Sequence, residues 1–206
     1  MKPPWWDEAG LALAARDPTL ARVMGECGPG HIVQRGDPFQ TLARSIVGQQ
    51  ISVAAAQAVW GRVVARARRV DPDRISRMRI ATLRDCGLSA RKAEYLKDLA
   101  ARFASGEVDP ARWAGLDDDE LVAELSRVRG VGRWTAEMLL IFNLHRPDVF
   151  PVDDVGLLRG IARNYTDGMV PTRSEALAIG ERWRPWRSLA TWYMWRCLDP
   201  LPVENR

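Results

Sequence analysis

Cysteine and histidine are scarce in this chain of 206 residues, which has three Cys and two His. The cysteines lie far apart and form no Cys-x-x-Cys pair, so neither a Cys/His zinc site nor a four-cysteine iron–sulfur cluster can be assembled. We therefore expect no zinc, no iron–sulfur cluster and no required cofactor, and we expect thiols that stay reduced and inert. The residues concerned are Cys27, Cys86, Cys197, His31 and His145.

Long apolar runs are also missing. No stretch reaches the roughly 18 residues that a membrane-spanning helix needs, and the first seven residues lack the basic and apolar regions of a signal peptide. We expect a cytoplasmic protein with no membrane contact. Apolar residues nevertheless make up 47% of the chain, which is enough to build a core in one sizeable unit or in two small ones.

Runs of alternating β-branched and polar residues are rare, so no strand is predicted. Apolar residues instead recur every three or four positions, as in Leu42, Ile46 and Val47, and again in Val59 and Val63. Glycine and proline interrupt this pattern at intervals that predict about ten short helices. The expected fold class is therefore all-α.

Positive charge is concentrated in one region of the sequence. The net charge is only +4, but residues 41–98 contain twelve Arg or Lys against five Asp or Glu. A phosphate backbone would be a fitting partner for such a region. A set of solvated helix faces is the alternative, which charge alone leaves open.

A glycine turn, Gly130-Val131-Gly132, separates two helical patterns. The helix before it is expected to open with a capping box of Asp117 and Glu120, and the helix after it to begin near Arg133. The first turn of a helix leaves backbone N–H groups without intrahelical partners, and these favour an anion. The turn therefore predicts a DNA phosphate site at its two glycines, Val131 and Arg133. Considered alone, a Gly-x-Gly between helices is more often an ordinary helix end.

Four motifs, in order, resemble those of the helix-hairpin-helix DNA glycosylases, the HhH-GPD superfamily. Residues 37–52 resemble the first core helix and the loop that probes the duplex, and residues 125–140 resemble the hairpin. Residues 150–160 resemble the loop with the catalytic aspartate, and residues 183–195 the closing segment of the 3-methyladenine DNA glycosylase II branch. Larger members of that branch have an N-terminal β-rich domain, which we do not expect here.

The resemblance implies two α-helical lobes with the active site in the cleft between them. Residues 37–143 would form the central lobe with the hairpin, and residues 1–36 together with 144–206 the second lobe. Aligned on the family pattern, Asp154 takes the catalytic role, and its neighbour Asp153 becomes a loop or capping group. Without the rest of the pattern, a helix N-cap would be the favoured role for either aspartate.

The resemblance also assigns residues that handle the damaged base. Trp134, Met138 and Trp195 would line the pocket for the extruded base, since an aromatic face attracts a cationic base. Gln50 would be the wedge that fills the gap in the duplex, with Gln49 as the alternative, although larger relatives have an apolar wedge. A helix-capping glutamine pair is the competing interpretation. The family hairpin also binds Na+ or K+ through carbonyl oxygens, and the matching positions are Ser126, Val128 and Val131.

The implied activity is hydrolysis without strand cleavage. Trp134 stands where the bifunctional branches have a lysine that forms a Schiff base, and an indole has no amine. An N3- or N7-alkylated purine already carries positive charge and leaves as a neutral base, so a single carboxylate can be enough. We therefore expect a monofunctional, monomeric DNA glycosylase that excises alkylated purines from double-stranded DNA in base excision repair.

Two other functions remain open at this point. One is a glycosylase for another lesion, such as uracil, hypoxanthine or an oxidised purine, and the other is a non-catalytic hairpin module that only binds DNA. Asp154 and the aromatic residues assigned to the pocket favour an enzyme over a binding module, because binding of the DNA backbone alone needs neither. The other tryptophans among the nine have less specific assignments. Core packing is favoured for Trp5, Trp6, Trp60 and Trp113, whereas Trp183, Trp186 and Trp192 could serve either the core or the site.

Overall fold

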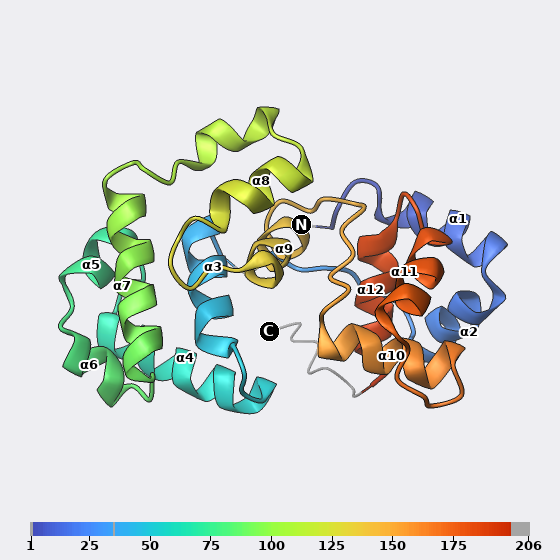
Figure 1. The fold of residues 1–206 in the computed structure, drawn as a ribbon, viewed down its shortest axis with the longest axis horizontal. Coiled ribbons are helices and arrows are strands. Elements are labelled where there is room, and N and C mark those ends of the chain that lie inside the picture. The colour runs from blue at the N-terminus through green and yellow to red at the C-terminus, as the bar shows by residue number, and fades with distance from the viewer. Residues whose placement is uncertain (1, 35, 199–206) are drawn as a thin grey trace. The chain divides into compact units, whose positions relative to one another are not determined.

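The computed structural model describes residues 2–34 and 36–198, and in this part of the chain it contains helices and no strand (Figure 1). The all-α prediction is therefore confirmed, although the helices are more numerous than the ten expected. They are α1 (Trp6–Arg16), α2 (Pro18–Cys27), α3 (Pro38–Gly48), α4 (Val53–Ala67), α5 (Pro72–Arg77), α6 (Ile80–Asp85), α7 (Ala90–Ala104), the 3-10 helix η1 (Pro110–Gly115), α8 (Asp118–Leu125), α9 (Arg133–Phe142), α10 (Val155–Tyr165), α11 (Arg173–Glu181) and α12 (Arg187–Arg196).

Backbone contacts divide the chain into two compact units. One is a continuous segment, residues 34–143, and the other combines residues 1–33 with residues 144–206. Among the described residues, no helix is both long enough and apolar enough to cross a membrane.

Helix α3 is the centre of the unit 34–143 and packs against α4, α7 and α9 (Figure 1). It begins where the Asp37 side chain accepts the N–H of Gln40 at 2.8 Å, with Pro38 at the first helical position. Its apolar face is buried, including Phe39, whose ring meets that of Phe103 edge-on at 5.4 Å. Burial of each such side chain stabilises the fold by roughly 1.5–3 kcal/mol.

Two helical hairpins follow α3 and α4 in this unit. The first joins α6 to α7 through Gly87, and the second joins α8 to α9 through Gly130; both glycines have positive φ. The capping box predicted at Asp117 and Glu120 opens α8 with both of its hydrogen bonds, and α9 begins at Arg133 as expected. Both segments therefore share the same order of helix, positive-φ glycine and helix.

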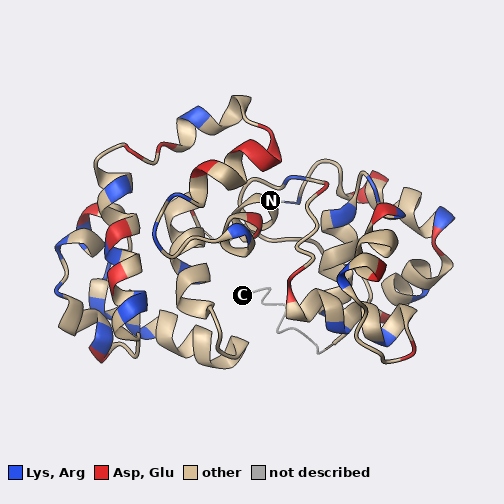
Figure 2. Ribbon diagram, viewed as in Figure 1, with Lys and Arg blue, Asp and Glu red and all other residues tan. Residues whose placement is uncertain are grey.

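Basic residues of the unit 34–143 are spread over α4 to α7, as Figure 2 shows, and acidic residues gather at the start of α8. Two of the cations have structural roles. Lys97 Nζ donates to the carbonyl oxygens of Ser76 and Met78, which ties α7 to the end of α5. Lys92 Nζ donates to two carbonyl oxygens at the end of α3.

The unit formed by residues 1–33 and 144–206 is built around a buried carboxylate. The Asp17 side chain is 1% exposed and caps α2 by accepting the N–H of Leu20 at 3.0 Å. It also accepts hydrogen bonds from Tyr165 Oη at 3.1 Å, Trp183 Nε1 at 3.2 Å and Arg182 at 3.2 Å. Burial and the nearby Asp17 raise the pKa of Tyr165. A carboxylate with this many donors ties α2, α10 and the end of α11 together.

Most tryptophans of the described residues belong to the core. Trp6, Trp60 and Trp113 are buried, as the sequence predicted, and Trp183 and Trp192 are buried as well. Trp5 and Trp186 are half-buried and stack on each other with ring centroids 5.8 Å apart. Trp183 and Trp192 are therefore packing residues. The two remaining tryptophans, both half-buried, are Trp134 and Trp195.

Candidate active site

Asp154 is the N-cap of α10, and its half-buried carboxylate is held by two hydrogen bonds to the same oxygen. Oδ1 accepts the backbone N–H of Leu157 at 2.6 Å and the indole N–H of Trp195 at 2.7 Å. The loop before it turns tightly, since the N–H of Asp154 donates to the carbonyl of Pro151 at 2.8 Å. A carboxylate at a helix N-terminus is stabilised in its charged form by the helix dipole. The N-cap interpretation and the catalytic one are therefore compatible.

Two glycines of α10 allow Trp195 to reach this carboxylate. A Cβ atom at Gly156 would lie 2.9 Å from Trp195 Cδ1 and 3.0 Å from Asp154 Oδ1, and a Cβ atom at Gly160 would lie 2.4 Å from the carbonyl oxygen of Met194. Any larger residue would push α12 away from α10. Both glycines lie within the motif of residues 150–160, but only the packing of α10 against α12 reveals their role.

Asp153 lies one residue before Asp154 and has a different environment. Its side chain is exposed and forms an ion pair with Arg173, the first residue of α11. This pairing fits the loop or capping role expected for Asp153. The two adjacent aspartates thus differ in burial and in partner, and only Asp154 is bonded to an aromatic side chain assigned to the base pocket.

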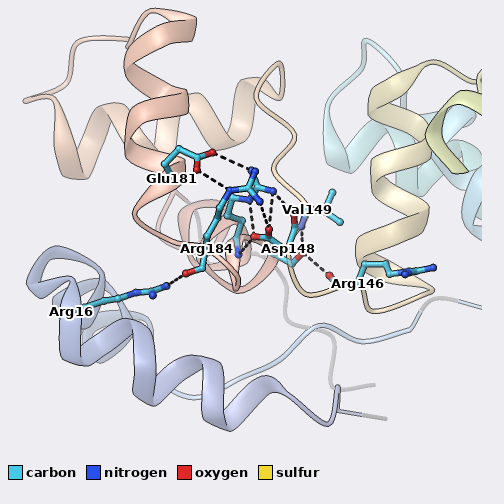
Figure 3. A network of polar contacts seen from close by, with 8 residues as sticks. Arg16, Arg146, Asp148, Val149, Glu181 and Arg184 are labelled. Carbon is cyan, nitrogen blue, oxygen red and sulfur yellow. Dashed lines mark hydrogen bonds and ion pairs between the residues drawn. The ribbon is translucent and has the colours of Figure 1, made fainter. Parts of the chain in front are cut away.

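An ion-pair network fixes the chain upstream of Asp154 to the start of α12 (Figure 3). The Asp148 carboxylate accepts two hydrogen bonds from the guanidinium of Arg187, at 2.7 and 2.9 Å, and one from that of Arg184 at 2.8 Å. Arg187 is only 14% exposed and also donates to the carbonyl oxygen of Asp148 at 2.9 Å. Ser188 adds two bonds, because its hydroxyl donates to the carbonyl of Arg146 at 2.6 Å and accepts the N–H of Val149 at 3.0 Å. Bidentate Arg–carboxylate pairs hold a defined geometry, so this network positions α12, which carries Trp195.

The two hairpin glycines of the unit 34–143, Gly130 and Gly132, differ in conformation and surroundings. Gly130 has φ +83°, and a Cβ atom there would lie 2.2 Å from Cδ2 of Tyr95. Gly132 has an extended backbone, φ −95° and ψ 178°, and a Cβ atom there would meet nothing within 4 Å. As the N-cap of α9, Gly132 contributes no side-chain hydrogen bond. The N-terminus of α9 is therefore exposed and has no side-chain cap, which suits an anion.

Two of the groups assigned to the phosphate site already have partners within the protein. The N–H of Val131 donates to the carbonyl of Val128 at 3.0 Å, so this amide is used within the hairpin. Arg133 pairs with Asp119 at 3.0 Å and with the buried Glu137 at 3.4 Å. The Asp119 hydrogen bond raises the pKa of Arg133. A phosphate would have to compete with Asp119 for this guanidinium.

The remaining predicted residues lie on elements of both units. Trp134 and the buried Met138 are on α9 of the unit 34–143, whereas Trp195 is on α12 of the other unit. Gln50 is exposed, with φ +58°, in the turn between α3 and α4. The side chain of Gln49 instead donates to the carbonyl of Gly130 and to Thr135. Of the two wedge candidates, Gln50 is exposed, whereas Gln49 is half-buried and bonded to the hairpin.

Comparison with known proteins places the chain in a family. A model of the HhH-GPD superfamily base excision DNA repair proteins matches residues 43–185. The chain belongs to this superfamily, and the resemblance that the four motifs indicated is confirmed.

The relatives have consistent names. DNA-3-methyladenine glycosylase 1 of Schizosaccharomyces pombe is 34% identical over 181 residues, which are 86% of this chain and 79% of that protein. The DNA-3-methyladenine glycosylase of Bacillus subtilis is 31% identical over 198 residues, which are 90% of this chain and 65% of that protein. Among solved structures, the S. pombe 3-methyladenine DNA glycosylase in complex with abasic DNA matches with a TM-score of 0.83 and 32% identity, over 92% of this chain and 95% of that one.

The two hairpin glycines should differ in their effect on stability. Gly130→Ala places a Cβ on the Tyr95 ring and forces alanine into positive φ, so we expect a loss of about 2 kcal/mol or more in the free energy of unfolding. Gly132→Ala, with ordinary φ and open space, should cost less than about 1 kcal/mol. Urea denaturation of both variants measures the difference. Equal losses would show that the hairpin backbone does not have the conformation described.

Proposed function

We propose that this protein is a monofunctional DNA glycosylase that extrudes alkylated purines, of the 3-methyladenine and 7-methylguanine type, from double-stranded DNA and removes them by hydrolysis in base excision repair. Membership of the HhH-GPD superfamily and the names of the relatives support the class of activity. The observation that carries the catalytic assignment is the Asp154 carboxylate, oriented by Trp195 and by the N-terminus of α10.

One oriented carboxylate fits the chemistry of an alkylated base. Cleavage of the N-glycosidic bond develops positive charge on the sugar, and a fixed negative charge stabilises that transition state without reorganising. Because both hydrogen bonds reach Oδ1, the orientation of the Asp154 carboxylate is set before the substrate arrives. The same carboxylate can orient the water that attacks the sugar. The leaving base is already cationic, so no second acid is needed to protonate it.

Trp134, Met138 and Trp195 are proposed to receive the extruded base. An electron-poor, cationic purine is attracted to an aromatic face, and Trp134 is half-buried beside the uncapped start of α9. The indole of Trp195 would have two functions, because its N–H already donates to Asp154. Loss of this side chain should therefore affect the catalytic carboxylate as well as the pocket.

The DNA backbone is proposed to bind at the hairpin, through the amides that start α9 and through Arg133. The basic residues of α4 to α7 (Figure 2) would add favourable longer-range attraction. Contact between Arg133 and a phosphate would replace its ion pair with Asp119, and an exposed pair of this kind contributes little stability. A monovalent cation bound to the carbonyl oxygens of Ser126, Val128 and Val131, and a monomeric state, stay predictions.

Replacing the proposed catalytic carboxylate tests this function. Asp154→Asn keeps the shape and removes the charge, so we expect base release to be lost while binding to lesion-containing DNA stays within about threefold of wild type. Asp153→Asn, which breaks only an exposed ion pair with Arg173, should have a much smaller effect. The measurement is single-turnover release of 3-methyladenine or 7-methylguanine from defined duplexes. Release by Asp154→Asn within threefold of wild type would exclude its catalytic role.

The indole N–H of Trp195 has its own test. Trp195→Phe keeps an aromatic face but cannot donate to Asp154, and a hydrogen bond to a charged group contributes about 1.5–3 kcal/mol. We therefore expect base release to fall about tenfold to a hundredfold. Trp186→Phe is the matched control, since Trp186 is also half-buried in this unit and stacks only on Trp5. If Trp195→Phe and Trp186→Phe behave alike, the hydrogen bond does not contribute to catalysis.

The hydrolytic course of the reaction can be checked by borohydride trapping. A lyase would pass through a Schiff base between an amine and the sugar. The sequence contains three lysines, Lys2, Lys92 and Lys97, and the last two already donate to pairs of carbonyl oxygens. We expect no covalent protein–DNA adduct when borohydride is added during turnover. A trapped adduct would contradict the monofunctional assignment.

A further inference from the structure

We propose that Gln49 and Lys92 are positioning residues that hold the Gly48–Ile51 turn against the hairpin, so that Gln50 is presented to DNA at a fixed place relative to the phosphate-binding amides. The inference rests on the proposed function, because only a protein that extrudes a base needs a wedge. All of the residues involved lie in the unit 34–143.

The backbone of Gln50 adopts a conformation that needs support. Its φ is +58°, in the left-handed region, and its side chain is exposed. This conformation costs a non-glycine residue roughly 1–2 kcal/mol, and it persists only where the surrounding structure determines it. The turn itself has only long backbone hydrogen bonds, from the N–H of Gln49 to Ile46 and from that of Ile51 to Gly48, both 3.4 Å. Its support must therefore come from outside the turn.

Lys92 supplies one part of this support from α7. Its Nζ donates to the carbonyl of Val47 at 2.8 Å and to the carbonyl of Gln49 at 2.6 Å. The second of these carbonyls belongs to the peptide group that leads into Gln50. Burial lowers the pKa of Lys92, and the negative end of the α3 dipole offsets the desolvation of the ammonium group. Although its burial is unfavourable, the Lys92 ammonium group fixes the last carbonyl groups of α3.

Gln49 supplies the second part by reaching the hairpin. Its Nε2 donates to the carbonyl of Gly130 at 2.8 Å and to Oγ1 of Thr135 at 3.0 Å. Gly130 is the positive-φ residue of the hairpin turn, and Thr135 is a buried residue in the first turn of α9. The Gln49 side chain thus connects the Gly48–Ile51 turn with the hairpin turn at Gly130 and with the first turn of α9.

The face presented next to Gln50 is suited to a base stack. Ile51 is 41% exposed and Val53 is 58% exposed, and the sequence from Gly48 to Gly61 contains no charged residue. Figure 2 shows the start of α4 without Lys, Arg, Asp or Glu. Uncharged side chains are the ones that enter between base pairs at low desolvation cost. In DNA, the distance between the phosphates and the gap left by an extruded base is fixed. A displacement of the wedge by about 1 Å can therefore lower the rate of base release by up to a hundredfold.

The test compares two duplexes that differ only in whether the lesion must be extruded. In one, 7-methylguanine is paired with cytosine, and in the other it is an unpaired single-nucleotide bulge. Gln49→Leu and Lys92→Met each remove the donors and keep the bulk of the side chain. We expect single-turnover release to fall about tenfold or more from the paired duplex and less than about threefold from the bulge. Equal losses on the two duplexes, or no loss on either, would overturn the proposal.

Matched variants separate positioning from general destabilisation. Lys97→Met removes the same type of ammonium–carbonyl contact from the same helix, but at α5, and Gln57→Leu alters an exposed glutamine on α4. Both should change release from the two duplexes equally. Gln50→Ala combined with Gln49→Leu should lose little more than Gln49→Leu alone, because the two side chains act through one wedge. Full additivity of the two losses would also overturn the proposal.

Amide hydrogen exchange provides a readout that needs no activity. Gln49→Leu and Lys92→Met should raise exchange in residues 48–52 and leave α10 unchanged, whereas Lys97→Met should leave residues 48–52 protected. Unchanged exchange in residues 48–52 would refute the positioning role of Gln49 and Lys92 even if release falls. If the wild-type protein releases 7-methylguanine from neither duplex, the proposed function fails instead, and exchange alone then decides whether Gln49 and Lys92 hold the turn.

Discussion

The hydrogen bond from the Trp195 indole to the Asp154 carboxylate depends on how closely α10 and α12 approach each other. Gly156 and Gly160 lie four residues apart on α10, so they share one face of the helix. A Cβ at either position would overlap atoms of α12 or its side chains. The Asp148 network fixes the other end of α12 to the chain that leads into α10. The orientation of one carboxylate oxygen is therefore determined by backbone contact and ion pairs, and not by the aspartate itself.

In the unit 34–143, close backbone contact likewise fixes the groups that are proposed to bind DNA. Its hairpin turns at Gly130, against the ring of Tyr95, and leaves the space at Gly132 open. The two glycines look equivalent in the sequence, but the first is required by packing within the protein and the second leaves room outside it. Gln49 and Lys92 extend this rigid region to the turn at Gln50. The groups proposed to contact DNA are thus held by buried or half-buried neighbours.

Several cationic side chains of this protein are already bound to acidic side chains or to backbone carbonyl oxygens. Arg133, Arg187 and Arg184 each contact acidic side chains, and Lys92 and Lys97 serve as helix-end caps. Because Lys92 and Lys97 belong to residues 41–98, the positive excess of that region is partly structural. Attraction of DNA would depend on the remaining exposed arginines and on the N-terminus of α9, because a paired cation contributes less to an external anion.

The sequence by itself determined the helical class, the capping box of α8, the hairpin and the family, because each of these depends on local spacing or on a motif of adjacent residues. It also ranked Asp154 above Asp153 through the order of the motif. Only the tertiary structure decided which indole donates to Asp154, which glutamine faces solvent, and that Lys92 closes the end of α3. Each of these contacts joins residues that are about 40 or more positions apart in the chain. Such contacts depend on how helices pack, and the periodicity of a single segment holds no information about its distant partner.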